Sequence, residues 1–246
     1  GSQSMGVGVT TGDSNVAVGF QAGHLMSIGV RNTLMGGLAG NAITEGLYNV
    51  AIGYQALGAN VDSDSNVAIG YSALALMTGT AGNTYNTAVG HQAGEQVTTG
   101  VSNTLIGGAA GDALTTGDYN VVIGRSALST EDSYGYNVAI GAFALINQNA
   151  NANAHNVAVG YNAGAAVTTG IYNTIVGGNA GDGITTGSEN VAIGYNALTT
   201  ANGSEGRNVA IGFGALAAQD GDGDAYNVAI GFEAGTAITS GVQNIL

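Results

Sequence analysis

The sequence predicts an all-β fold, a β-solenoid of about 13–14 coils with 17–20 residues in each coil. Three observations lead to this prediction. One motif returns along nearly the whole chain at almost constant spacing, which is typical of stacked repeats. Val, Ile and Thr flank the first residue of the motif and favour strands. Gly supplies 44 of the 246 residues, far more than helices tolerate.

The motif is clearest in "NVAIGYQAL" at 49–57, which returns as "NVAIGYSAL" at 66–74 and "NVAIGYNAL" at 190–198. We count positions from its Asn, which is position 0. In all thirteen complete units Gly stands at position 4 and Ala at position 7. The units begin near Asn15, Asn32, Asn49, Asn66, Asn86, Asn103, Asn120, Asn137, Asn156, Asn173, Asn190, Asn208, Asn227 and Asn244.

Each unit is expected to form one coil, because a repeat of this length is too short for two packed helices, which need roughly 33 residues. The segment "N-V-A-I-G" is the expected strand. A turn, often Thr-Thr-Gly as at 98–100, leads to the next Asn. The segment "Y-x-A-L" is either a second strand or one helical turn.

The recurring residues have structural explanations. Stacked Asn side chains can form amide ladders and satisfy the backbone groups of turns. Gly at position 4 allows a positive φ or a close backbone approach. Positions 2 and 5 exchange size, as Ala51 with Tyr54 and Leu34 with Gly37 show. This exchange indicates that the chain bends at the intervening Gly, or that the two positions meet across an interface.

Units four apart resemble one another, which gives a superperiod of 70 or 71 residues. The lengthened spacers precede Asn86, Asn156 and Asn227, so every fourth coil is expected to carry a larger loop at one edge. We assign residues 1–11 to a cloning remnant and N-terminal lead-in, and 12–246 to a single repeat domain. We expect this domain to be a fragment of a longer fibre protein.

Charge and composition exclude several classes of partner. The formal net charge is −13, with three Arg and no Lys, so neither nucleic acid nor an anionic membrane surface is an expected partner. No run of 18 apolar residues exists, so membrane insertion is not expected. The absence of Cys excludes disulfides and thiolate metal sites.

Both faces of the expected strand are apolar, with Val and Ile on one and Ala or Leu on the other. A single coil has one interior and can bury only one of these faces. We expect the face with small residues to pack closely against other copies, because Ala and Gly allow another backbone to approach. A homotrimer around a shared axis is then the economical assembly, and Ala158→Phe should disrupt it.

The "N-V-A-I-G-x-x-A" units resemble the head repeats of YadA-like trimeric autotransporter adhesins. They are also similar to the "N-T-A-I-G-Y-x-A-L" arrays of phage tail fibres and related bacterial surface fibres. The resemblance covers roughly residues 12–246, although the units here are longer than those of the adhesins. It implies a left-handed parallel β-roll, three chains side by side, and an extracellular place on a bacterial cell surface or a virion tail fibre. The implied function is attachment to a host or target cell through an unidentified receptor or glycan.

The loop "QDGDGDAYN" contains the one metal-site candidate, Asp220, Asp222 and Asp224. Calcium loops place carboxylates at alternating positions in this way. The distal Glu of an EF-hand is missing, so a solvated acidic turn is the alternative. No other cofactor is expected.

No catalytic arrangement stands out, and the chain is not expected to be an enzyme. The candidate acids Glu45, Glu95, Glu131 and Asp132 are scattered over expected turns, and a glycosidase needs two placed carboxylates. The alternative function is a monomeric solenoid that binds a glycan or ice directly. Tyr precedes the Asn in six units and could stack on a sugar or cover the next rung, at Tyr48, Tyr85, Tyr119, Tyr136, Tyr172 and Tyr226.

Overall fold

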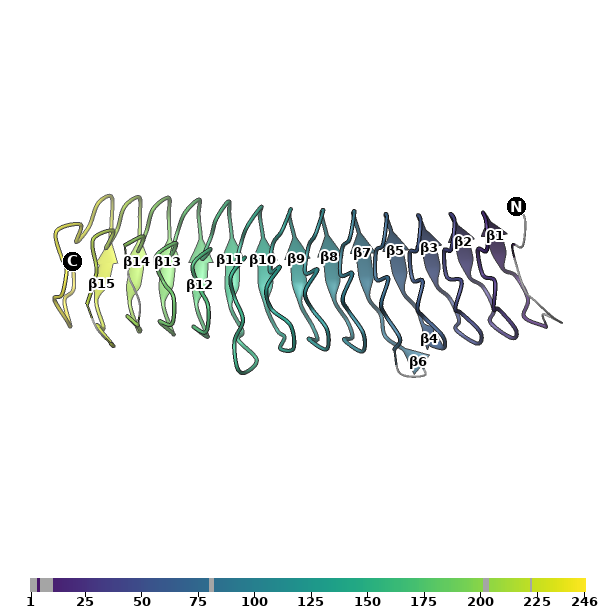
Figure 1. Cartoon of the computed structure of the whole chain (residues 1–246). Coiled ribbons are helices and arrows are strands. Elements are labelled where there is room, and N and C mark those ends of the chain that lie inside the picture. The colour runs from purple at the N-terminus through teal and green to yellow at the C-terminus, as the bar shows by residue number, and fades with distance from the viewer. Residues whose placement is uncertain (1–3, 5–10, 80–81, 201–203, 222) are drawn as a thin grey trace. The chain divides into compact units, whose positions relative to one another are not determined.

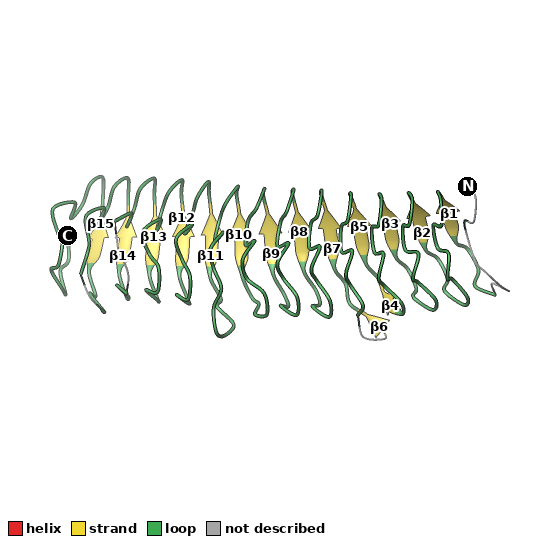
Figure 2. Cartoon of the chain, in the orientation of Figure 1, coloured by secondary structure: helices red, strands yellow, loops and turns green. Residues whose placement is uncertain are grey.

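The computed structural model describes residues 4, 11–79, 82–200, 204–221 and 223–246. The chain divides into two compact units, Gly1–Tyr119 and Asn120–Leu246. Each unit is a parallel β-solenoid, and together they have about 12 turns (Figure 1). This is slightly fewer than the 13–14 coils expected, because thirteen successive rungs enclose twelve full turns. The described residues form strands and loops but no helix (Figure 2).

The strands lie where the motif predicts them, at positions 1–3 of each unit. In the first unit they pair in parallel in chain order as β1 (Val16–Val18), β2 (Thr33–Met35), β3 (Val50–Ile52), β5 (Val67–Ile69), β7 (Thr87–Val89) and β8 (Thr104–Ile106). In the second unit the order is β9 (Val121–Ile123), β10 (Val138–Ile140), β11 (Val157–Val159), β12 (Thr174–Val176), β13 (Val191–Ile193), β14 (Val209–Ile211) and β15 (Val228–Ile230).

Within each unit equivalent positions pair, for example Val50 with Val67, so the coils of a unit stack in register. A small second sheet pairs β4 (Ser63–Asp64) with β6 (Gly82–Asn83) in parallel. It lies at the base of the longer spacer before Asn86, where the chain projects beyond the neighbouring coils (Figure 1).

Gly at position 4 ends each strand and has both properties that the sequence suggested. Gly36 has a φ of 136°, in the region that favours glycine. A Cβ atom on Gly36 would lie 2.5 Å from the carbonyl oxygen of Gly53 in the next coil. Any larger residue would therefore push two coils apart, which confirms the prediction of a close backbone approach.

The segment after this Gly is a turn, and both alternatives considered for "Y-x-A-L" are wrong. Positions 6 and 8 have positive φ, as in Gln55 (56°) and Leu57 (49°), and these values alternate with ordinary ones. Such alternation supports neither a helix nor a strand. The turn is still tied to its neighbour, because the Leu57 backbone N–H donates to the Ala73 carbonyl at 3.0 Å.

The strand faces are oriented opposite to the expectation for the interface. Ala158 and the other strand residues at position 2, except the half-buried Ala17 of β1, are fully buried inside the coil, while Val157 and Val159 point outward and remain half-buried. The turn folds back over this face, and buried side chains of the turn, such as Ala56 and Leu57, fill the interior with it. Ala158→Phe therefore tests core packing, and the expectation that the small residues face other copies is wrong.

The exchange of size also has a different partner from the one expected. Position 5 is on the surface, where Tyr54 is 46% exposed, so it cannot compensate for a buried residue at position 2 of its own chain. In the coils that begin at Asn32 and Asn49 the exchange is with position 8, whereas the coils that begin at Asn86 and Asn156 have Ala at position 2 and Gly at position 8. Leu34 fills the space beside Gly40, whose added Cβ would lie 2.8 Å from Leu34 Cδ2. Where position 8 is Leu57, position 2 is Ala51.

Candidate functional surface

A ladder of buried Asn side chains holds the coils together and confirms the predicted structural role. Asn49 accepts on Oδ1 from the backbone N–H of Asn66 at 3.0 Å, and its Nδ2 donates to the Ser63 carbonyl at 2.9 Å. The same arrangement recurs in the second unit, where Asn173 receives the N–H of Asn190 at 3.0 Å and donates to Gly187 at 2.9 Å. Both groups of each amide are used internally, so this ladder offers nothing to a ligand.

The outward face of the strands is apolar and carries no charge. Positions 1 and 3 hold only Val, Ile, Thr and Met in β1 to β3, β5 and β7 to β15. Their side chains range from half-buried to exposed, with Ile106 at 37% and Ile230 at 60%. We call these two columns of side chains the outer strand face. It is the part of each unit that the coil itself leaves uncovered.

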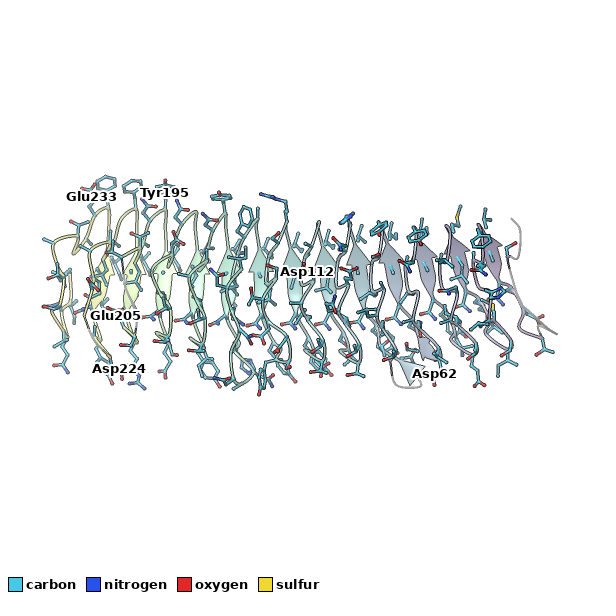
Figure 3. All side chains as sticks on the ribbon, in the orientation of Figure 1. Asp62, Asp112, Tyr195, Glu205, Asp224 and Glu233 are labelled. Carbon is cyan, nitrogen blue, oxygen red and sulfur yellow. The ribbon has the colours of Figure 1, made fainter. Side chains whose placement is uncertain are left out.

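Beside the outer strand face, position 5 forms a column of exposed rings. In the first unit Tyr54, Tyr71 and His91 stack in sequence, with centroid separations of 5.6 and 5.1 Å. In the second unit Tyr195, Phe213 and Phe232 stack at 5.6 and 5.2 Å. Figure 3 shows Tyr195 at the outer end of its turn, with its ring directed away from the ribbon.

Position −1 forms a second exposed column, in which several Tyr rings contact side chains of an adjacent coil. Tyr136, His155 and Tyr172 stack with centroid separations of 5.0 and 5.4 Å. Arg31 donates to the Tyr48 hydroxyl at 2.6 Å and lies 5.3 Å from its ring centroid. These contacts agree with rings that cover the next rung.

The acidic loop is only partly described. Asp222 lies outside the described residues. Asp224 forms an ion pair with Arg207, which also lies 3.2 Å from Glu189. Among the described residues, no three His, Asp or Glu side chains are placed to hold a metal ion. Calcium binding at Asp220, Asp222 and Asp224 remains a prediction.

One acid that the sequence placed on a turn is in fact buried. Glu131 is fully buried and accepts hydrogen bonds from Gln148 Nε2 at 3.2 Å, the Ala150 N–H at 3.1 Å and the Tyr134 N–H at 3.2 Å. Burial raises the pKa of this carboxyl above its ordinary value, against the opposing effect of these hydrogen bonds. Its signal in the sequence was position 11, which is buried in other coils whether it is apolar, as in Val97 and Leu114, or polar, as in Gln148.

The described residues contain no helix that is long and apolar enough to cross a membrane. Comparisons with protein families, curated proteins and solved structures found no match to this chain.

Proposed function

We propose that this chain is a structural and adhesive segment of a homotrimeric fibre, on a bacterial cell surface or a virion tail, that attaches its bearer to a host or target cell. The observation that carries the proposal is the uncharged, apolar outer strand face, which recurs on every described rung. Continuous apolar surfaces of this kind usually mark interfaces.

A second copy of the same chain is the occupant that fits this face best. Its rungs have the same spacing of roughly 4.8 Å, so apolar columns of two copies match rung by rung. The three Arg residues all lie off the outer strand face, with Arg31 and Arg207 at position −1 and Arg125 at position 5. A closed ring of three copies covers the face on each, and symmetric closure is usual for homo-oligomers.

The fibre setting rests on the repeated motif and on what a solenoid does well. Stacking is open-ended, so the number of rungs sets the reach of the segment. The similarity of the units to adhesin head repeats and tail-fibre arrays supports an extracellular place and a role in attachment. Three copies in a fibre, and many fibres on a particle, raise avidity even when each contact is weak.

An attachment assay tests the function itself. Fluorescent protein is added to a panel of bacterial and eukaryotic cells, and a version carrying Ile106→Lys and Ile123→Lys on the outer strand face serves as the unassembled control. We expect the unchanged protein to bind at least one cell type more tightly than the control. Equal binding, or binding to none, would count against an adhesive fibre segment.

A further inference from the structure

The first unit contains a hollow of about 300 Å³ on the turns that follow the strands. Its lining comes from positions 6, 9 and 10 of successive coils, and consists of Asn41, Gln55, Gly58, Ala59, Ser72, Ala75, Leu76 and Glu95. All of these residues belong to the coils that begin at Asn32, Asn49, Asn66 and Asn86. We call this hollow the turn groove.

The groove exists because two coils carry small side chains where their neighbours carry long ones. Gly58 and Ala75 occupy position 9, and Ser72 occupies position 6. Asn41 closes one end, with its amide oriented so that Nδ2 donates to the carbonyls of Leu38 at 3.1 Å and Gly58 at 2.8 Å. The ends are therefore held by internal contacts and the groove needs no ligand to form.

The other end is fixed in the same way. Glu95 accepts a hydrogen bond from Gln92 Nε2 at 2.7 Å, which holds its carboxylate at the rim. This carboxylate keeps lone pairs for further donors, because a carboxylate has about four acceptor sites.

The lining is amphipathic along its length. Gln55 and Glu95 offer an amide and a carboxylate, and Ser72 adds a hydroxyl that is only 3% exposed, while Ala59, Ala75 and the 45% exposed Leu76 offer apolar surface. A saccharide has the matching pattern, with hydroxyl groups around its edge and apolar C–H groups on its faces. Ligand sites combine a few placed polar groups with apolar walls in this manner.

The adjoining rings supply further surface of the same kind. Tyr54, Tyr71 and His91 stand directly before the position 6 residues of three of these coils and form one continuous stack. Tyr presents a large rigid apolar face with a hydroxyl at its tip, which suits contact with a sugar. A saccharide longer than one unit could continue from the groove towards these rings.

Charge selects against acidic ligands. The groove lining contains no Lys, Arg or His, and Glu95 is its one ionisable residue. Asp112 follows Glu95 in the position 9 column. Burial is the main cause that raises the pKa of Asp112, and the negative charge of Glu95 raises it further. Two acids at one end, on a chain of net charge −13, disfavour sialylated, sulfated or phosphorylated sugars.

The second unit provides a natural comparison. One superperiod of 71 residues after Ser72 and Ala75 stand Phe143 and Ile146. Ser72 and Phe143 have the same left-handed backbone, with φ of 53° and 63°, so the coil accepts either side chain. The Phe143 ring packs beneath Arg125 at 4.5 Å and edge-on to Tyr161 at 6.0 Å, so position 6 of this coil carries a ring where the first unit has the small Ser72.

We infer that the turn groove binds a neutral saccharide through polar contacts with Gln55 and Glu95 and an apolar contact with Leu76. This inference names a class of ligand for the proposed attachment function, and its biological setting rests on that proposed function.

The test is saturation-transfer NMR followed by calorimetry on the whole chain, with cellobiose, lactose, mannobiose and chitobiose as probes. We expect one or more of these disaccharides to bind, and the double variant Ser72→Phe, Ala75→Ile to weaken binding at least tenfold. The matched control Asn162→Phe, Ala165→Ile places the same side chains at positions 6 and 9 of the second unit and should leave binding unchanged. Circular dichroism confirms that both variants fold.

A single substitution sharpens the result, since Glu95→Gln keeps the shape of the groove and should weaken binding several-fold. The inference is overturned if none of the four sugars binds, if the filled groove binds as well as the open one, or if a sialylated lactose or a Lys-rich peptide is preferred. A monomeric chain that binds a neutral sugar would contradict the trimeric fibre and support the saccharide site in the turn groove. A trimer that binds none of the sugars would support the fibre and contradict the saccharide site.

Discussion

The two faces of each three-residue strand are both apolar, yet they have opposite fates. The inner face, at position 2, is fully buried in β2, β3, β5 and β7 to β15, whether it holds Ala139 or the larger Leu105. The outer face at positions 1 and 3 remains half-buried or exposed. The comparison teaches that hydrophobicity alone does not decide which face turns inward, because both faces are apolar and only one is enclosed by the turns.

The largest expected effect comes from the Gly residues that let this inner face close. Gly141→Val should prevent the second unit from folding, because φ is 131° and the new Cβ would fall on the carbonyl oxygen of Gly160. We expect a loss of more than about 4 kcal/mol in unfolding free energy, seen as a missing transition in thermal circular dichroism. Gly108→Ala is the control, since its Cβ would meet nothing within 4 Å, and a similar loss there would contradict this explanation.

The inner face itself should be nearly as sensitive. Ala158→Phe adds a ring to a wall that is fully buried and continuous with Ala139 and Ile175 in the adjoining strands. Overpacking of this kind costs about 3 kcal/mol. Denaturant unfolding should show this loss for Ala158→Phe and a much smaller one for Val159→Phe on the outer face. Equal losses would mean that the two faces do not differ in packing.

Much of this architecture could be predicted from the sequence, because the same residue types recur at the same positions in thirteen units. The strand positions, the Asn ladder and the close approach at Gly36 and its equivalents all follow from residue types at fixed spacing. Which face lies inside does not follow, because alternation along three residues looks the same from either side. The pairing of Leu34 with Gly40 was missed because it depends on how the turn folds back over the strand.

The candidate sites were less predictable still. Glu131 was placed on a turn because an acid in a Ser-, Thr- and Gly-rich stretch usually lies in solvent. Its burial depends on Gln148 in the next coil, a contact between residues 17 apart. The turn groove depends on an absence of volume in two adjacent coils, at Gly58 and Ala75, and becomes visible only after the coils are stacked.

A smaller effect tests the buried acid at position 11. Glu131→Gln should raise the unfolding free energy at pH 7 by on the order of 1 kcal/mol, because the ionised carboxyl is disfavoured by burial. Since burial raises the folded pKa above the unfolded one, the contribution of Glu131 is present at acid pH. It is lost as pH rises from the unfolded value of about 4.5 through the folded value.

Unfolding at pH 4 and pH 7 measures this difference. The unchanged protein should lose more stability than Glu131→Gln between the two values. The exposed Glu45→Gln is the control and should behave as the unchanged protein does. If Glu131→Gln is destabilising at both pH values, the hydrogen bonds to the Glu131 carboxyl stabilise the folded protein by more than the burial of this group destabilises it.

The smallest effect is expected at the acidic loop. Asp224 already pairs with Arg207, and both side chains are exposed, so solvent screening leaves the interaction little effect on stability. Addition of a chelator should leave the melting temperature unchanged if the loop is solvated. A clear fall with chelator that calcium reverses, and that Asp220→Asn abolishes, would establish a calcium site instead.

The mass of the protein in solution tests the central claim most directly, since the claim is that copies of the chain cover the outer strand face. Light scattering should give about three times the chain mass of 24.0 kDa for the unchanged protein. The double variant Ile106→Lys, Ile123→Lys should give the mass of one folded chain. An unchanged protein that is monomeric at all concentrations, with its outer strand face in water, would contradict the account.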